Sequence, residues 1–166
     1  MIEYVRHNYN KIKNFVYAVG YFGEVIMFIL AVVLLFKNYT DLIFYIIGLG
    51  FSDTLNKYLK KIIKQSRPEN VIKYLDSEKI DKTKVVYGMP SGHSQNVFYS
   101  IFYLYMCCVR DQNLILLLFA FMGMITIYQR YTFYNHTILQ LVVGAILGIS
   151  IAYSVLYIKN IVLNVM

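Results

Sequence analysis

The sequence has few charged side chains, and acidic residues are the scarcer kind. Only 15% of its 166 residues are charged and 58% are hydrophobic, which excludes an ordinary soluble domain. Nine Asp and Glu stand against 16 Lys and Arg, so the net charge is +7. This excess is typical of lysines beside anionic lipid headgroups, or of a site for an anionic substrate. No nucleic-acid-binding module accompanies it, so we expect no nucleic acid partner.

Cysteine and proline are also scarce. The two cysteines, Cys107 and Cys108, are adjacent within an apolar run, which excludes a disulfide framework and offers no metal-ligand spacing. We expect them to face lipid or to pack, and we predict no metal site. Both prolines, Pro68 and Pro90, fall in one polar connector. No short apolar core with a cleavage site opens the chain, so we expect the first span to be an uncleaved anchor.

Hydrophobic residues come in blocks whose lengths approach those needed to cross a bilayer. The pattern predicts an all-α integral membrane bundle of about five transmembrane helices, forming one domain over 1–166. Tight connectors at 37–41 and 110–113 predict antiparallel neighbours, and the long polar connector 60–93 is interpreted as an active-site loop. The predicted spans are 15–36, 42–59, 94–109, 114–128 and 137–158.

Alternating spans would bring the unusual polar residues together. The end of the second span, the start of the third, the end of the fourth and the start of the fifth would meet on one membrane face. We therefore expect that face to gather Lys60, Arg67, His93, Arg130 and His136.

The first polar cluster is KKIIKQSRP, at residues 60–68. The ammonium of Lys60 and the planar guanidinium of Arg67 suit phosphate oxygens, and Pro68 stiffens the exit. Basic residues at the end of a span also serve as headgroup anchors, and this cluster alone does not separate the two interpretations.

The second cluster is YGMPSGHSQ, at residues 87–95. Pro90, Ser91 and Gly92 predict a turn into a helix, whose N-terminus attracts anions. Ser91 is a candidate cap, Gly92 allows close approach of a phosphate, and His93 could donate a proton near neutral pH. The alternative is a capped helix beside an incidental histidine.

The third cluster is QRYTFYNHTILQ, at residues 129–140. His136 and Gln140 are four residues apart, so on a helix they share one face. The Gln140 carbonyl could then accept from one imidazole nitrogen and leave the other as a nucleophile. Arg130 would close the preceding span.

Together the three clusters resemble the motifs of the type 2 phosphatidic acid phosphatase superfamily, over roughly 42–158. The resemblance implies a haloperoxidase-like helical core and metal-independent phosphoryl transfer without a cofactor. His136 would attack phosphorus, and His93 would protonate the leaving oxygen and later activate water. The residues that would hold the phosphate oxygens are Lys60, Arg67, Pro90, Ser91, Gly92 and Arg130, with Gln140 orienting His136.

Two positions depart from that superfamily pattern. Its third motif usually begins with Ser-Arg and has Asp four residues past the histidine, where this chain has Gln129 and Gln140. The dolichyl diphosphatase branch also has Gln at the second position and resembles YGMPSGHSQ closely. Between Tyr134 and His136 this chain has one additional residue, Asn135, that the dolichyl diphosphatase pattern lacks. A neutral amide activates the nucleophile less than a carboxylate, which favours diphosphate substrates.

The sequence therefore predicts a membrane phosphatase that converts dolichyl or another polyprenyl diphosphate to the monophosphate. The alternatives are phosphatidate or undecaprenyl diphosphate as the substrate, and a catalytically dead relative that binds lipid headgroups. The oligomeric state is left open.

Two further features bear on the site and its location. Glu24 is interpreted as structural, whereas Asp53 could support the site or make an interhelical hydrogen bond. The positive-inside rule puts the active face in the cytosol, whereas the dolichyl branch is expected to act at the lumenal face of the endoplasmic reticulum. Both orientations stay open.

Overall fold

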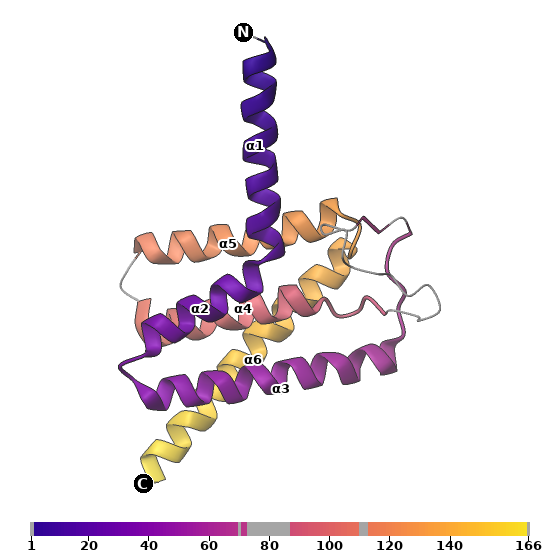
Figure 1. Ribbon diagram of the computed structural model, residues 1–166. Coiled ribbons are helices and arrows are strands. Elements are labelled where there is room, and N and C mark those ends of the chain that lie inside the picture. The colour runs from indigo at the N-terminus through magenta and orange to yellow at the C-terminus, as the bar shows by residue number, and fades with distance from the viewer. Residues whose placement is uncertain (1, 70, 73–86, 110–112, 166) are drawn as a thin grey trace.

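The computed structural model (Figure 1) describes residues 2–69, 71–72, 87–109 and 113–165, with side chains for 11–69, 71–72, 87–108 and 113–164. The middle of the predicted active-site loop, 73–86, and the connector 110–112 lie outside the described residues. All regular elements in the described part are helices, as predicted. They are α1 (Ile2–Tyr21), α2 (Gly23–Leu35), α3 (Tyr39–Ile63), α4 (Gly92–Leu104), the π-helix η1 (Tyr105–Val109), α5 (Asn113–Thr132) and α6 (Ile138–Val165).

The expected first span, 15–36, is not a plain helix. It is divided at Phe22 between α1 and α2, whose axes are bent by 65°. Glycines flank the bend: a Cβ on Gly20 would come within 2.5 Å of Gln129, and one on Gly23 would collide with Thr126. Both contacts are to α5, so the bend is where the chain passes closely over that helix. In Figure 1, α1 points away from the bundle.

By length and composition, α5 and α6 could each cross a membrane, and the bent α1–α2 pair could form a third span. Helix α4 is only 13 residues long, so the predicted number of five spans stays a prediction. The outer surface of the bundle is apolar. Val33, Leu117 and Ile146 are each more than half exposed, at 67%, 66% and 57%. Such a surface is suited to lipid rather than to water.

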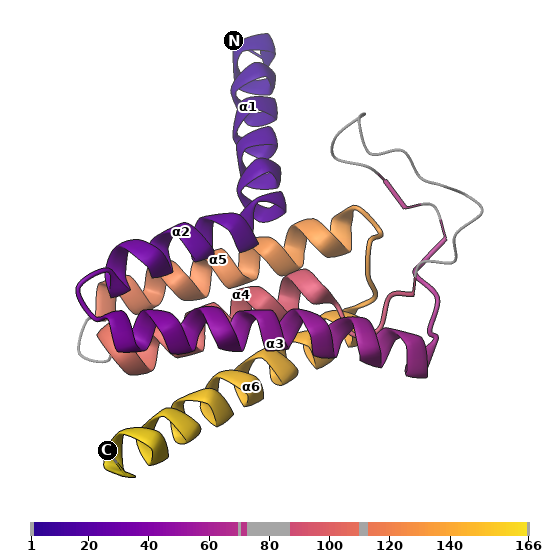
Figure 2. The ribbon, with the colours of Figure 1, turned by 60° about the horizontal axis from the view of Figure 1, so that its bottom comes forward.

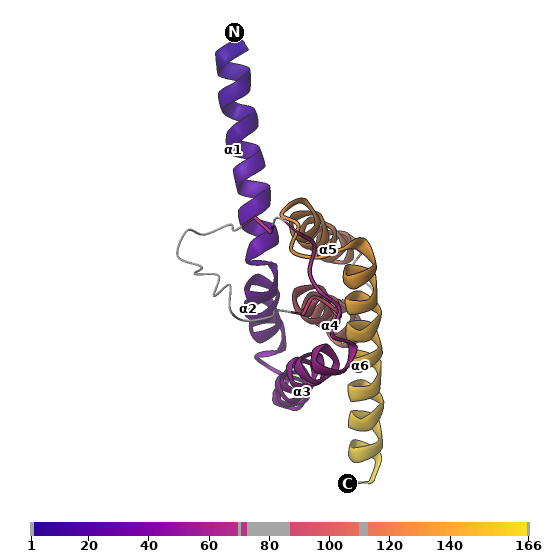
Figure 3. The ribbon, with the colours of Figure 1, turned by 90° about the vertical axis from the view of Figure 1, so that its right-hand side faces the viewer.

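Helix α4 occupies the centre of the bundle, with α2, α3, α5 and α6 around it (Figure 3). Its side chains Val97, Tyr99, Tyr103 and Leu104 are fully buried. Cys107 and Cys108 are free thiols that pack against this core, as one of the two expectations for them stated. Packing of polar and apolar groups on every side of α4 fixes the position of its N-terminus.

Both ends of the bundle carry polar contacts, but only one carries the predicted motifs. At one end, Lys159 Nζ of α6 lies 2.7 Å from Asp41 Oδ1 of α3. At the other, the end of α3, the start of α4, the end of α5 and the start of α6 lie together (Figures 1 and 2). This is the convergence that alternating spans predict.

Candidate active site

A polar cavity of about 180 Å³ lies at the motif-bearing end of the bundle. Its walls come from the end of α1, the segment after α3, the start of α4, the end of α5 and the turn between α5 and α6. The lining residues are Tyr21, Arg67, His93, Arg130, Asn135 and His136. The fold therefore joins residues from all three sequence clusters in one cavity.

His136 stands in the turn between α5 and α6 and is 4% exposed. Its Nδ1 lies 3.2 Å from Gln140 Oε1. The same oxygen accepts a hydrogen bond from the Thr137 backbone N–H at 3.2 Å. The first turn of α6 therefore brings the imidazole and the amide together, on the shared face that their spacing indicates.

The orientation of the Gln140 amide is fixed from its other side. Its Nε2 donates to the Ser66 carbonyl at 2.9 Å and to Gln65 Oε1 at 3.1 Å. A backbone carbonyl can only accept, so the amide oxygen must face His136. His136 then donates from Nδ1, and its Nε2 keeps a lone pair. The amide thus selects one tautomer of the imidazole.

Burial lowers the pKa of His136 to about 3, and the nearby charges of Arg67, Lys60 and Arg130 act in the same direction. The hydrogen bond to Gln140 opposes this shift only in part. A histidine in these surroundings is neutral throughout the physiological pH range, the form in which an imidazole nitrogen can act as a nucleophile.

The second cluster is bound directly to the third. The Ser91 backbone N–H donates to the Gln140 carbonyl oxygen at 3.1 Å. A Cβ on Gly88 would lie 2.6 Å from Gln140 Oε1, so a larger residue there would displace the Gln140 amide. The Gly88 N–H donates to the Gln65 carbonyl at 2.8 Å, which ties the segment after α3 to the same place. The three clusters form one connected structure around the Gln140 amide.

Ser91 caps α4, as its position predicts, because its hydroxyl accepts from the Ser94 N–H at 3.4 Å. The side chain is fully buried, and neither Ser91 nor Pro90 lines the cavity. For the N–H groups of Gly92 and His93, no hydrogen bond to another described residue is found. Gly92 does not line the cavity either, but a Cβ there would be 3.8 Å from Lys60 Nζ, which puts this cation beside the turn.

Arg130 is 7% exposed, and its guanidinium lies over the Tyr21 ring at 5.3 Å. Sequence reasoning missed Tyr21 as a residue of the cavity, since a tyrosine in an apolar run carries no distinguishing signal. Gln129, the other departure from the superfamily pattern, is fully buried, packs against Gly20 and does not line the cavity.

Asn135, the additional residue, belongs to the C-terminal cap of α5. Tyr134 has φ 52°, its N–H donates to Tyr131, and the Asn135 N–H donates to Arg130 O at 3.0 Å. These two hydrogen bonds form a Schellman motif, which usually has glycine at the left-handed position. The motif turns the chain so that Asn135 and His136 both line the cavity.

The two acidic residues of the apolar segments differ in their distance from the histidines. Asp53 Oδ1 accepts from Asn96 Nδ2 at 3.0 Å, and Oδ2 pairs with Lys57 at 3.6 Å. Asp53 therefore makes the interhelical hydrogen bond that was one of its two interpretations. Glu24 Oε2 lies 3.8 Å from His93 Nδ1, a contact that the interpretation of Glu24 as structural did not anticipate. In the described part of the chain, no three His, Cys, Asp or Glu side chains group as metal ligands do.

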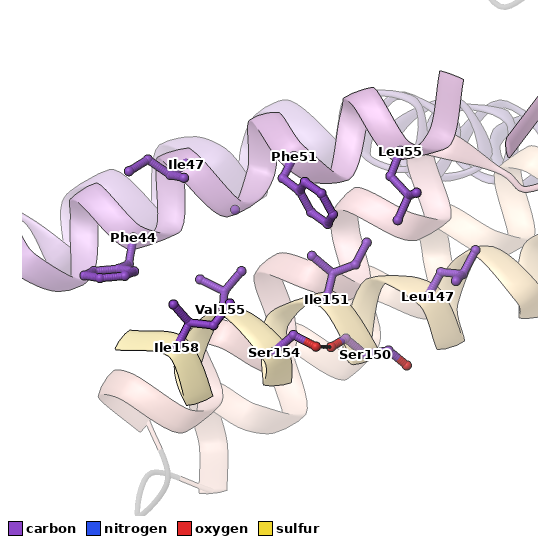
Figure 4. A pocket seen from close by; sticks show the side chains of 11 residues that line it. Phe44, Ile47, Phe51, Leu55, Leu147, Ser150, Ile151, Ser154, Val155 and Ile158 are labelled. Atoms are coloured by element: carbon purple, nitrogen blue, oxygen red, sulfur yellow. Dashed lines mark hydrogen bonds between the residues drawn. The ribbon is translucent and has the colours of Figure 1, made fainter. Parts of the chain in front are cut away.

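A larger groove of about 490 Å³ lies between α3 and α6 (Figure 4). Its walls are apolar side chains such as Phe44, Phe51 and Val155. The two hydroxyls there are satisfied within α6: Ser150 donates to Ile146 O, and Ser154 donates to Ser150 O. Among the described residues, no ionisable group lines this groove, so the smaller polar cavity is the candidate reaction site.

The structure is thus a helical bundle with two histidines and several cations gathered at one end. A model of the PAP2 superfamily matches residues 18–162, and the chain belongs to that superfamily. This confirms the family to which the sequence motifs pointed.

Two curated relatives and one solved structure are similar to the chain. Lipid phosphate phosphatase gamma of Arabidopsis thaliana is 30% identical over 78% of this chain and 58% of its own length. Dolichyldiphosphatase 1 of Dictyostelium discoideum is 33% identical over 72% of this chain and 53% of its own length. The chain thus spans a little over half the length of these relatives.

The solved structure is a transmembrane PAP2 type phosphatidylglycerolphosphate phosphatase from Bacillus subtilis. Its TM-score is 0.66 at 18% identity, and the match covers 91% of this chain and 76% of that one. At this identity the likeness shows a shared fold.

Proposed function

We propose that this chain is a membrane lipid phosphatase that hydrolyses dolichyl or another polyprenyl diphosphate to the monophosphate and phosphate. The observation that carries the proposal is the contact of His136 Nδ1 with Gln140 Oε1, in an amide whose orientation Ser66 fixes. It leaves His136 Nε2 as the nucleophilic atom in a cavity that also contains His93, Arg67 and Arg130.

The proposed reaction has two steps. His136 Nε2 attacks the terminal phosphorus as the bond to the leaving oxygen breaks, and His93 gives that oxygen a proton. Water then attacks the phosphohistidine, His93 takes the proton of the water, and the nitrogen–phosphorus bond breaks. Arg67, Arg130 and Lys60 would stabilise the charge on the phosphoryl oxygens, with the N–H groups of Gly92 and His93. No step requires a metal ion.

Gln140 supports a diphosphate as the substrate. A neutral amide stabilises a developing imidazolium less than a carboxylate would, so the nucleophile is only mildly activated. A diphosphate compensates, because its leaving group is a phosphomonoester and departs easily. One relative is a dolichyldiphosphatase, which agrees with this interpretation. The other is a lipid phosphate phosphatase, so a simple lipid phosphate such as phosphatidate is the second candidate substrate.

The proposed location is a multi-pass position in a membrane, the endoplasmic reticulum if the host is eukaryotic. The outward apolar side chains and the apolar helices α5 and α6 support a membrane location. The assignment to the endoplasmic reticulum rests on the likeness to the dolichyl diphosphatase branch.

Phosphate release by the purified full chain tests the proposal. We expect faster release from dolichyl diphosphate than from phosphatidate or undecaprenyl diphosphate, inhibition by orthovanadate, and no effect of chelators. His136→Ala should abolish turnover. Phosphate release that persists in His136→Ala would refute the assignment of His136 as the nucleophile. Release from no substrate would favour a protein that only binds lipid headgroups.

A further inference from the structure

Glu24 brings a carboxylate to His93 from a helix that carries none of the three motifs. It lies in the first turn of α2, and its side chain is 32% exposed. Its Oε2 is 3.8 Å from His93 Nδ1, an ion-pair distance rather than a hydrogen bond. Distances in catalytic pairs often shorten when substrate binds, so this separation is compatible with direct interaction.

The carboxylate is held in place by α4 and α3. Asn96 Nδ2 donates to Glu24 Oε1 at 2.7 Å, while Asn96 Oδ1 accepts from Ser52 Oγ at 2.8 Å. Asn96 is 3% exposed and lies three residues after His93, on the same face of α4. Because Oε1 is bound to Asn96, Oε2 is the oxygen directed to the imidazole. The interface of three helices therefore determines where the carboxylate lies.

We propose that Glu24 is the positioning residue for His93. Its carboxylate accepts from Nδ1–H, directs Nε2 to the substrate, and stabilises the imidazolium that donates the proton. The inference rests on the proposed function and adds a residue outside the superfamily motifs. Glu24 neither gives nor takes a proton in these steps: the proton moves from His93 Nε2 to the leaving oxygen, and in the second step from water back to Nε2.

The surroundings of His93 explain why this partner has to be an anion. In the described part of the chain, the charged and titratable groups around it are Tyr21 of α1, Glu24 of α2, Lys60 of α3, Arg67, Arg130 of α5, and His136. Three of these are cations, and they repel a second proton on the imidazole. His136 must stay neutral to attack, and it has a neutral amide as its partner. His93 must become charged to donate, and it has a carboxylate.

Glu24→Gln tests the proposal, with Asp53→Asn as the matched control. Asp53 bonds the same Asn96 nitrogen, and none of its hydrogen bonds or ion pairs in the described part of the chain reaches His93. The probes are aryl phosphates from phenyl to p-nitrophenyl, which share one phosphoryl group and differ in their need for a proton on the leaving oxygen. The purified full chain is assayed in nanodiscs.

We expect Glu24→Gln to lower kcat for phenyl phosphate by about 10- to 100-fold with little change in KM, since general acid catalysis contributes about 10²–10⁴-fold in total. The initial burst of p-nitrophenolate should stay within a few-fold of wild type, and the high-pH limb of the rate profile should move to lower pH. Asp53→Asn should affect both esters little. Equal losses for both esters, equal losses in Asp53→Asn, or no loss in Glu24→Gln would each overturn the proposal.

Imidazole ¹⁵N spectra give a readout that is independent of turnover. In the wild-type chain, His93 should carry its neutral-state proton on Nδ1, and Glu24→Gln should lose this preference, whereas Asp53→Asn should keep it. A His93 tautomer that Glu24→Gln leaves unchanged would refute the positioning role. If the wild-type chain releases phosphate neither from dolichyl diphosphate nor from any phosphate ester, the proposed function fails by itself, and these spectra still decide whether Glu24 orients His93.

Discussion

At the scale of single residues, the candidate site depends on which protons the two histidines carry. The amide of Gln140 can serve His136 only because its Nε2 is bound to the Ser66 carbonyl. A donor is thus required on one side of this side chain and an acceptor on the other. The Gln140 amide supplies both at neutral pH, whereas the ionised Asp of the superfamily pattern would supply no donor.

Gln140→Glu tests this requirement at almost constant side-chain volume. An ionised carboxylate would face the Ser66 carbonyl oxygen, which can only accept, and would leave it without a donor. An unsatisfied buried acceptor costs about 1–3 kcal/mol, so we expect about 10- to 100-fold lower kcat/KM at pH 8. Protonation of the new carboxyl restores a donor, so the deficit should shrink toward pH 5. A deficit that does not change with pH would contradict this account.

Gln140→Asp addresses the substrate rather than the hydrogen bonds. If the amide suits activated diphosphates, the variant should act on phosphomonoesters at least as well, relative to diphosphates, as the wild-type chain does. The measurement is the ratio of kcat/KM for dolichyl diphosphate and phosphatidate. A collapse for phosphatidate alone would run against the role assigned to Gln140.

The low pKa of His136, about 3, has a consequence that can be measured without substrate. Its imidazole ¹⁵N shifts should remain those of a neutral ring, protonated at Nδ1, from pH 7.5 to 5; loss of the signals in His136→Asn assigns them. Below pH 6.5, the ordinary value, an unfolded chain binds a proton that the folded chain does not. The free energy of unfolding should therefore decrease as the pH is lowered below 6.5. A titration midpoint near pH 6.5 in the His136 ¹⁵N shifts would contradict the argument that burial lowers this pKa.

At the scale of secondary-structure elements, the contact between α4 and α6 determines how the second and third clusters meet. A Cβ on Gly144 would lie 2.5 Å from the Ser91 carbonyl oxygen, and one on Gly148 would collide with the Gln95 carbonyl oxygen. Small residues four apart let two helices approach closely, as in many membrane proteins. The depth of this contact positions His93 relative to His136.

Gly148→Ala should therefore separate α4 from α6. We expect a loss of stability of about 1–3 kcal/mol from overpacking, and a loss of activity, because both histidines depend on this interface. Gly50→Ala is the matched control, since nothing lies within 4 Å of the added Cβ, and helix propensity makes it neutral or stabilising. Thermal unfolding in one detergent compares the two variants. Equal thermal unfolding midpoints in the two variants would show that the close contact between α4 and α6 does not contribute to stability.

At the scale of the whole molecule, charge is unequally divided between the two ends of the bundle. In the described part of the chain, the active-site end carries Lys57, Lys60, Lys61, Lys64, Arg67 and Arg130. The opposite end carries Lys37 and Lys159, and Lys159 is paired with Asp41. By the positive-inside rule, this distribution predicts a cytosolic active site.

Single cysteines in a chain whose Cys107 and Cys108 are replaced by alanine test this orientation. In sealed microsomes with the cytosolic face outward, a membrane-impermeant maleimide should label Lys61→Cys, at the active-site end. It should label Lys37→Cys, at the opposite end, only after detergent is added. Both positions are exposed. The reverse pattern would place the site in the lumen, as expected of the dolichyl branch.

The sequence by itself determined the helical class, the end of the bundle that carries the site, and the family. Apolar blocks and alternating spans fix these features through burial of hydrophobic side chains and through connectivity. The pairing of His136 with Gln140 also followed from local helical spacing.

Only the tertiary structure decided the remaining features. The bend at Phe22, the place of Tyr21 in the cavity, and the fixed amide of Gln140 depend on contacts between residues far apart in the chain. Glu24 and His93 are separated by almost 70 residues in the sequence and meet at 3.8 Å. No local pattern encodes that contact, because it arises only when α2, α3 and α4 pack together around Asn96.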